Sequence, residues 1–202
     1  MISVIVPYNA DRGWLNRCLA SIENQTYENF ECIESLSTNT VGYNFNRGLE
    51  KARGEFCKFV CEDDWLPPTA LADLAEGIGN HPWICANSMN HTAKNWLDKS
   101  AVTSLEEMIE KNTINGGTTL YRTALLRAID GMDEELETGE EYDMHLKLYS
   151  LGYIPGYIDK TVYNHQISLK QKSLILRRTR PEWRAEQINK IRARYDKRYR
   201  TV

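Results

Sequence analysis

The chain has 202 residues, of which 42% are hydrophobic and 26% are charged, and its net charge is −3. This is the composition of an ordinary globular protein, and the length suits one domain, or one domain with an appendage. No apolar run approaches the ~18 residues that a membrane-spanning helix needs, and the start of the chain has the pattern of a strand rather than of a signal peptide. We therefore expect a cytoplasmic protein.

Strands and helices alternate through the first half of the chain. Short apolar runs predict strands at 2–6, 30–33 and 56–60, and helical spacing of apolar residues predicts helices at 13–24, 44–52 and 68–77. The second half continues with predicted strands at 83–86, 118–121 and 153–162 and predicted helices at 105–110, 123–129, 139–151 and 181–200, while 90–104 has an irregular, polar sequence. This alternation predicts an α/β sheet with a binding site where its strands end.

An acidic turn follows the predicted strand at 56–60. Glu62, Asp63 and Asp64 stand at the carboxyl end of this strand, where open α/β sheets bind their ligands. Paired carboxylates supply the hard oxygen ligands that suit Mg²⁺ or Mn²⁺, and these ions suit phosphates. The alternative for the turn alone is an acidic cap on the next helix, because Asp is common at such positions.

A second group of acids opens the predicted helix at 139–151. Glu140, Glu141 and Asp143 lie in its first turn, after a glycine. Acids are favoured there by the helix dipole, which is a sufficient reason for Asp143. The loop before the helix is acidic as well, so the two acidic sites could face each other across a cleft, one holding a metal and one acting as a general base.

An ordered set of motifs resembles the family 2 glycosyltransferases, which have the GT-A fold. The motifs stand at 2–9, 19–22, 25–27, 46–49, 62–64, 116–122, 131–136, 139–144 and 162–165. The resemblance spans residues 1 to about 173 and implies a compact, Rossmann-like α/β/α domain with a mostly parallel mixed sheet. Residues 1–88 would form the nucleotide-sugar half, 89–173 the acceptor half, and 174–202 a basic helical tail.

The resemblance also implies roles for single residues. Asp64 would be the main ligand of Mn²⁺ or Mg²⁺, with Asp63 and His165 near the same ion. Glu141 falls where the family carries the Asp of a Glu-Asp pair, the base that deprotonates the acceptor, and Glu140 is its stand-in. The implied nucleotide-sugar pocket is made by Pro7, Tyr8, Asn9, Arg12, Glu34, Arg47 and Asp63.

The implied activity is an inverting, metal-dependent transfer of a sugar from a nucleotide-diphosphate sugar to a hydroxyl of a glycan or lipid-linked glycan. The alternatives are transfer to a nucleic-acid base, or a degenerate module that only binds nucleotide sugars. The second alternative is motivated by departures from the family: Ser35 replaces an Asp that often contacts the nucleobase, and the stretch at 37–46 is shorter than usual. A nucleotidyltransferase would need a glycine- and lysine-rich phosphate loop, which 7–15 is not.

The C-terminal segment is strongly basic. Residues 170–202 contain 12 Lys and Arg against 3 acids, which leaves a net charge of −12 for the remainder. One interpretation is a solvated helix that packs its apolar stripe on the core. The other is a contact with a nucleic acid, or with an anionic membrane, which would place the protein at the inner face of that membrane.

Overall fold

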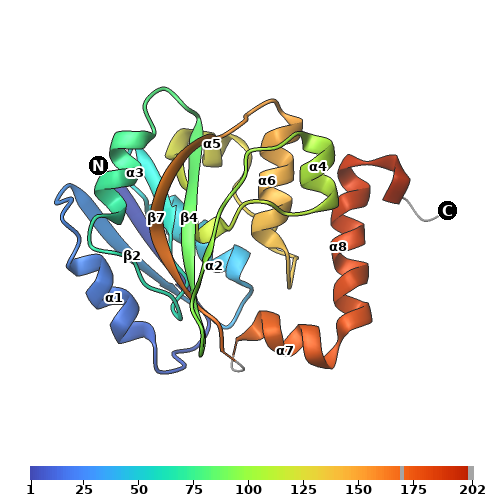
Figure 1. The fold of residues 1–202 in the computed structure, drawn as a ribbon, viewed down its shortest axis with the longest axis horizontal. Helices are drawn as coiled ribbons and strands as arrows, with labels where there is room; N and C mark the ends of the chain where they lie inside the picture. The colour runs from blue at the N-terminus through green and yellow to red at the C-terminus, as the bar shows by residue number, and fades with distance from the viewer. Residues whose placement is uncertain (169–170, 200–202) are drawn as a thin grey trace.

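The structure, a computed structural model, describes residues 1–168 and 171–199 (Figure 1). Its strands are β1 (Ile2–Tyr8), β2 (Phe30–Leu36), β3 (Phe56–Phe59), β4 (Trp83–His91), β5 (Trp96–Asp98), β6 (Leu120–Arg122) and β7 (Gly156–Gln166). Its helices are α1 (Leu15–Glu23), α2 (Val41–Lys51), α3 (Ala70–Gly77), α4 (Leu105–Glu110), α5 (Thr123–Ala128), α6 (Glu140–Ser150), α7 (Lys172–Thr179) and α8 (Pro181–Tyr195), with 3₁₀ turns η1 (Gly116–Thr118) and η2 (Lys197–Tyr199). No helix in the described part of the chain is long and apolar enough to cross a membrane.

The described residues form a seven-stranded mixed sheet in the order β2-β1-β3-β6-β4-β5, with β7 paired to β4. β1 pairs in parallel with β2 and β3, and β4 pairs in parallel with β7. β6 is antiparallel to both β3 and β4, so those two strands run in the same direction. The predicted α/β class with a mostly parallel sheet is therefore confirmed. The carboxyl ends of β1, β3 and β7 lie at one edge, where ligands of such sheets bind.

Helices cover both faces of the sheet and give three layers. One face is packed by α1 and α3, through apolar side chains such as Cys18, Ile22 and Leu74. The other is packed by α2, α4, α5 and α6, through side chains such as Phe45 and Leu146. This amphipathic covering follows from the helical spacing of apolar residues in the sequence.

Several boundaries predicted from the sequence differ from those of the structure by a few residues, and two of these differences follow from strand pairing. β2 continues to Leu36, three residues beyond the predicted strand at 30–33, because its parallel register with β1 extends as far as the pair Tyr8 and Leu36. The polar stretch at 90–104 is also less irregular than expected. β4 runs on to His91, and Trp96–Asp98 turns back to pair with it as β5. The backbone pairing of β4 with β5 and β7 thus outweighs the weak strand propensity of this polar sequence.

The basic C-terminal segment forms α7 and α8, and α8 runs beside α4 and α6 (Figure 1). Ile191 of α8 is fully buried in the core cluster on that side of the sheet, and Ile188 packs against it. Arg194 pairs with Asp133 at 2.8 Å and with Asp143 at 3.0 Å. Apolar burial and these ion pairs together fix α8 against α6 and the loop that precedes it.

Gly48 lets α2 approach β1 closely. A Cβ at this buried position would overlap Cγ2 of Ile5. We predict that Gly48→Ala lowers the free energy of unfolding by ~1–3 kcal/mol, because overpacking outweighs the ~0.5–1 kcal/mol that Ala gains in helix propensity. Denaturant unfolding measures this change. The exposed substitution Glu50→Ala on the same helix is the control, with an expected change within ~0.5 kcal/mol. Unchanged or increased stability of Gly48→Ala would contradict the account.

Candidate active site

The acidic turn after β3 is held in place by the end of β7. Val60 continues the strand by donating its N–H to the carbonyl of Ile5 at 2.9 Å, and the chain then turns, with the N–H of Asp64 donating to Cys61 O at 3.1 Å. The Asp64 carboxylate accepts the Tyr163 hydroxyl at 2.6 Å on one oxygen and the Gln166 N–H at 2.7 Å on the other. The side chain of Asp64 is therefore oriented from both sides.

Asp64 is a buried acid in an acidic neighbourhood. Burial and the charge of Asp63 raise the pKa of Asp64 well above its usual range, although the hydrogen bonds from Tyr163 and Gln166 act in the opposite direction. Burial and Asp63 also raise the pKa of Glu62, which pairs with Arg12 at 2.6 Å. A bound cation would relieve this repulsion and stabilise the ionised carboxylates.

The donor set at this turn fits a hard divalent cation. Ligand atoms of Cys61, Asp63 and Asp64 lie within 4.8 Å of one another. The two carboxylates match Mn²⁺ or Mg²⁺, whereas burial raises the pKa of the Cys61 thiol well above its usual range and keeps it protonated.

His165 lies beside this group with its tautomer set by its neighbours. Nδ1 lies 2.8 Å from Asn90 Oδ1, an acceptor, so Nδ1 carries the proton. Burial lowers the pKa of His165 and keeps the ring neutral. Its Nε2 therefore keeps a lone pair, which the Gln171 amide approaches at 3.4 Å. This is the arrangement that a histidine needs to serve as a metal ligand.

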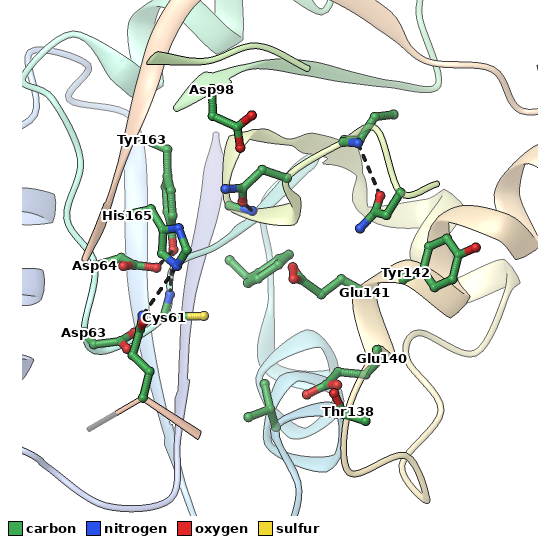
Figure 2. Close-up of a pocket in the computed structure, with 18 of the residues that line it drawn as sticks. Cys61, Asp63, Asp64, Asp98, Thr138, Glu140, Glu141, Tyr142, Tyr163 and His165 are labelled. Atoms are coloured by element: carbon green, nitrogen blue, oxygen red, sulfur yellow. Dashed lines mark hydrogen bonds between the residues drawn. The ribbon is translucent and has the colours of Figure 1, made fainter. Parts of the chain in front are cut away.

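The two glutamates of α6 lie across the cavity from this group (Figure 2). Gly139 precedes them in the left-handed region, with φ +82°, and Glu140 begins the helix. Side chains of α8 close the space over this turn, since a Cβ at Gly139 would lie 2.8 Å from Ile191 Cδ1 and 2.9 Å from Ile188 Cδ1. The backbone conformation thus favours glycine here, and the absence of a Cβ lets the two isoleucine side chains pack directly on the turn.

Glu141 is a carboxyl group with a pKa near neutrality. Burial and the charge of Glu140 raise the pKa of Glu141 to about 7, while the charge of Lys58 acts to lower it. Lys58 is completely buried, and its ammonium group donates to Gly117 O and to Phe59 O, the latter at 3.2 Å. Burial lowers the pKa of Lys58 to about 7. A carboxyl with a pKa near the working pH can exchange a proton with a bound hydroxyl.

One cavity of about 770 Å³ connects the two acidic sites. It brings together nine of the candidate residues named from the sequence: Pro7, Tyr8, Asn9, Arg12, Asp63, Asp64, Glu140, Glu141 and His165. The structure places the other two outside its lining. Glu34 accepts the Tyr8 hydroxyl at 3.0 Å, and Arg47 pairs with Glu50 at 2.8 Å and with Glu134 at 3.3 Å.

Sequence reasoning missed several residues of the site. Lys58 lies within a short apolar run, but nothing in the sequence pointed to its burial or to its charge as a neighbour of Glu141. Tyr163 and Asn90 hold Asp64 and His165 only through the tertiary pairing of β7 with β4. Asp98 enters the cavity near His165 because β5 folds back on β4.

Two neighbouring charges act on Glu141 in opposite directions, which makes its titration a test of the site. We predict that Glu141 titrates near pH 7, that Lys58→Met raises its pKa and that Glu140→Gln lowers it. Carboxyl ¹³C NMR of glutamate-labelled protein measures all three. Glu186→Gln, which changes an exposed acid of α8 outside the cavity lining, is the control and should leave the titration unchanged. A Glu141 pKa near 4.5 in the wild type would contradict the burial described above.

No family model matches the chain. Among curated proteins, it is 22% identical over 211 residues to EpsH of Bacillus subtilis (strain 168), whose name assigns it to the glycosyltransferases, covering 83% of this chain and 61% of that protein. It is 24% identical over 204 residues to the chondroitin synthase of Pasteurella multocida (strain Pm70), covering 81% of this chain and 20% of the synthase. The chain thus spans about three-fifths of the first relative and a fifth of the second.

The chain is also similar to solved structures. The chain superimposes on S. aureus TarS in complex with UDP with a TM-score of 0.72 at 22% identity, covering 96% of this chain and 64% of that one. It superimposes on the mannosyltransferase PcManGT from Pyrobaculum calidifontis, in complex with GDP-Man and Mn²⁺, with a TM-score of 0.67 at 14% identity, covering 96% of this chain and 64% of that one. These comparisons confirm that the chain resembles the family 2 glycosyltransferases and has the GT-A fold.

Proposed function

We propose that this protein is an inverting, metal-dependent glycosyltransferase that moves a sugar from a nucleotide-diphosphate sugar to a hydroxyl acceptor. The observation that carries the proposal is the pair of acidic sites facing each other in one cavity, with Asp63 and Asp64 on one side and Glu141 on the other (Figure 2). The solved relatives named above bind UDP or GDP-Man, which supports a donor of this class.

The donor would lie along the end of β1. Pro7, Tyr8 and Asn9 line the cavity there, and Arg12 donates to Asn9 Oδ1 at 2.9 Å while it pairs with Glu62. These contacts hold the β1 end and the acidic turn together as one surface. We assign the nucleoside to the β1 end and the diphosphate to the acidic turn.

Asp64, Asp63 and the neutral His165 would hold Mn²⁺ or Mg²⁺. Such an ion, when bound, neutralises the negative charge that develops on a diphosphate leaving group. The chain prepares for this by orienting Asp64 with two hydrogen bonds and His165 with one. Asp63 offers its carboxylate to the same space, while Arg17 fixes its backbone by donating to Asp63 O at 2.6 Å.

Glu141 would act as the general base. With a pKa of about 7, a substantial fraction of this carboxyl is ionised at neutral pH, and the ionised form can accept the proton of the acceptor hydroxyl. The hydroxyl oxygen then attacks the anomeric carbon as the bond to the diphosphate oxygen breaks. Because base and diphosphate lie on opposite sides of the cavity, attack comes from the face opposite the leaving group and inverts the anomeric centre.

Substitutions that separate donor binding from turnover test the proposal. We expect Mn²⁺ with one nucleotide from a panel of UDP, GDP, dTDP, CDP and ADP to stabilise the wild type by ~2.7 kcal/mol at 100-fold excess over Kd. Asp64→Asn should abolish that stabilisation. Glu141→Gln should retain it, but should slow hydrolysis of the matching sugar nucleotide, with water as acceptor, by ~10²–10⁴-fold.

The control is Glu186→Gln, which changes an exposed acid on α8 and should alter neither readout. Stabilisation that survives in Asp64→Asn would contradict the assigned metal site. Donor binding without turnover in the wild type, across many acceptors, would instead favour the degenerate binding module.

The activity itself should depend on pH in a direction fixed by Glu141. Because the raised pKa of this base must be exceeded before it can accept a proton, kcat/KM, which reports the titration of the free enzyme, should rise through about pH 7 and level off above it. A pH–rate profile of sugar-nucleotide hydrolysis measures this limb. A profile that is flat between pH 5 and 8 would contradict the role of Glu141 as the base.

A further inference from the structure

Two arginines of the C-terminal helices line the cavity and form no ion pair with any residue that the structure describes. Arg177 of α7 is exposed and Arg184 of α8 is half-buried, and both line the cavity. Among the residues that the structure describes, neither forms an ion pair, and the Nε atom of Arg184 is buried without a hydrogen bond. In contrast, Arg194 and Arg198 farther along the chain are paired with acids.

The two arginines carry like charges into the same cavity. The charge of Arg177, together with burial, lowers the pKa of Arg184, and the same charge acts on the His165 ring. Arg177, Arg184 and His165 thus line one cavity, and the charge of Arg177 acts on both of the others. Like charges in a partly desolvated cavity are unfavourable, and an anion bound between them would remove the repulsion.

The packing of α8 places Arg184 on the side of the cavity that carries Glu141. Ile188 contacts the turn at Gly139, which leads directly into Glu140 and Glu141. Arg184 stands one helical turn before Ile188 on the same face of α8, a rise of ~6 Å. Arg184 is thus near the loop of the proposed base, whereas the proposed nucleoside surface lies at the end of β1.

We propose that Arg177 and Arg184 form an anion site that binds a phosphate group of the acceptor and so presents its hydroxyl to Glu141. This inference rests on the proposed function, which it extends by naming a phosphate-bearing acceptor. Guanidinium groups suit phosphate because they donate parallel hydrogen bonds to two of its oxygens. The phosphate could belong to a lipid headgroup or to a soluble phosphate ester, which share this chemistry.

The test is binding of sn-glycerol 3-phosphate, measured by calorimetry with and without saturating Mn²⁺ and the nucleotide that stabilises the protein most. We expect binding in both conditions, because the site is separate from the donor diphosphate. The double variant Arg177→Gln/Arg184→Gln should weaken it at least tenfold. Arg178→Gln, which changes an exposed neighbour outside the cavity lining, is the matched control and should bind like the wild type.

Sedimentation with vesicles distinguishes the two sources of phosphate. Vesicles of phosphatidylglycerol that bind the wild type but not the double variant, and that compete with glycerol 3-phosphate, would assign the site to a lipid headgroup. Binding of glycerol 3-phosphate without any binding of these vesicles would assign it to a soluble phosphate ester. Both results support the anion site, and neutral phosphatidylcholine vesicles are the control.

Two results would overturn the proposal. Loss of glycerol 3-phosphate binding when the nucleotide is present would assign the arginines to the donor diphosphate, and no binding in either condition would remove the site. The titration without nucleotide does not depend on donor binding, so failure of this site and failure of the proposed function remain distinguishable. Unchanged thermal unfolding of the double variant verifies that it is folded.

Discussion

The site depends on how the end of β7 holds the Asp64 carboxylate. The Tyr163 hydroxyl and the Gln166 N–H bind its two oxygens, and the neighbouring backbone of Trp65 pairs with Asn164 in both directions, at 2.9 and 3.2 Å. Each hydrogen bond to a charged group contributes ~1.5–3 kcal/mol, while burial of a carboxylate costs several kcal/mol. The raised pKa of Asp64 indicates that burial and the charge of Asp63 outweigh these bonds. A positive charge bound at this turn would therefore stabilise the ionised carboxylate.

The opposite wall depends on a different contact, between α8 and the turn at Gly139. The side-chain ends of Ile188 and Ile191 lie so close to that turn that they would have to shift to admit a Cβ at Gly139. The same helix anchors Asp143 through Arg194 and the Tyr195 hydroxyl, the latter at 3.2 Å. The basic segment is thus packed on the first turn of the helix that carries Glu141. The isoleucines and the arginine of α8 thus both contact the start of α6 and the residues just before it.

Much of the fold could be predicted from local sequence, because buried parallel strands are continuous apolar runs and the covering helices are amphipathic. The acidic turn and the glutamates of α6 could be predicted as well, since each follows a recognisable strand end or helix start. The rest depends on long-range pairing. β5, and with it Asp98, exists because Trp96–Asp98 pairs with β4, and no local pattern marks it. Arg47 had a suitable charge and motif position, yet the structure pairs it with Glu50 and Glu134, because the chain brings the loop at 131–136 over α2.

The central claim is that the two acidic sites belong to one reaction centre, with the donor diphosphate at Asp63 and Asp64. A crystal structure with Mn²⁺ and a nucleoside diphosphate, with the metal located by anomalous scattering, tests it most directly. We predict an anomalous peak between these carboxylates and the diphosphate, with the nucleoside at the end of β1 and Glu141 across the open cavity. A metal or nucleotide bound away from Asp63 and Asp64 would contradict it.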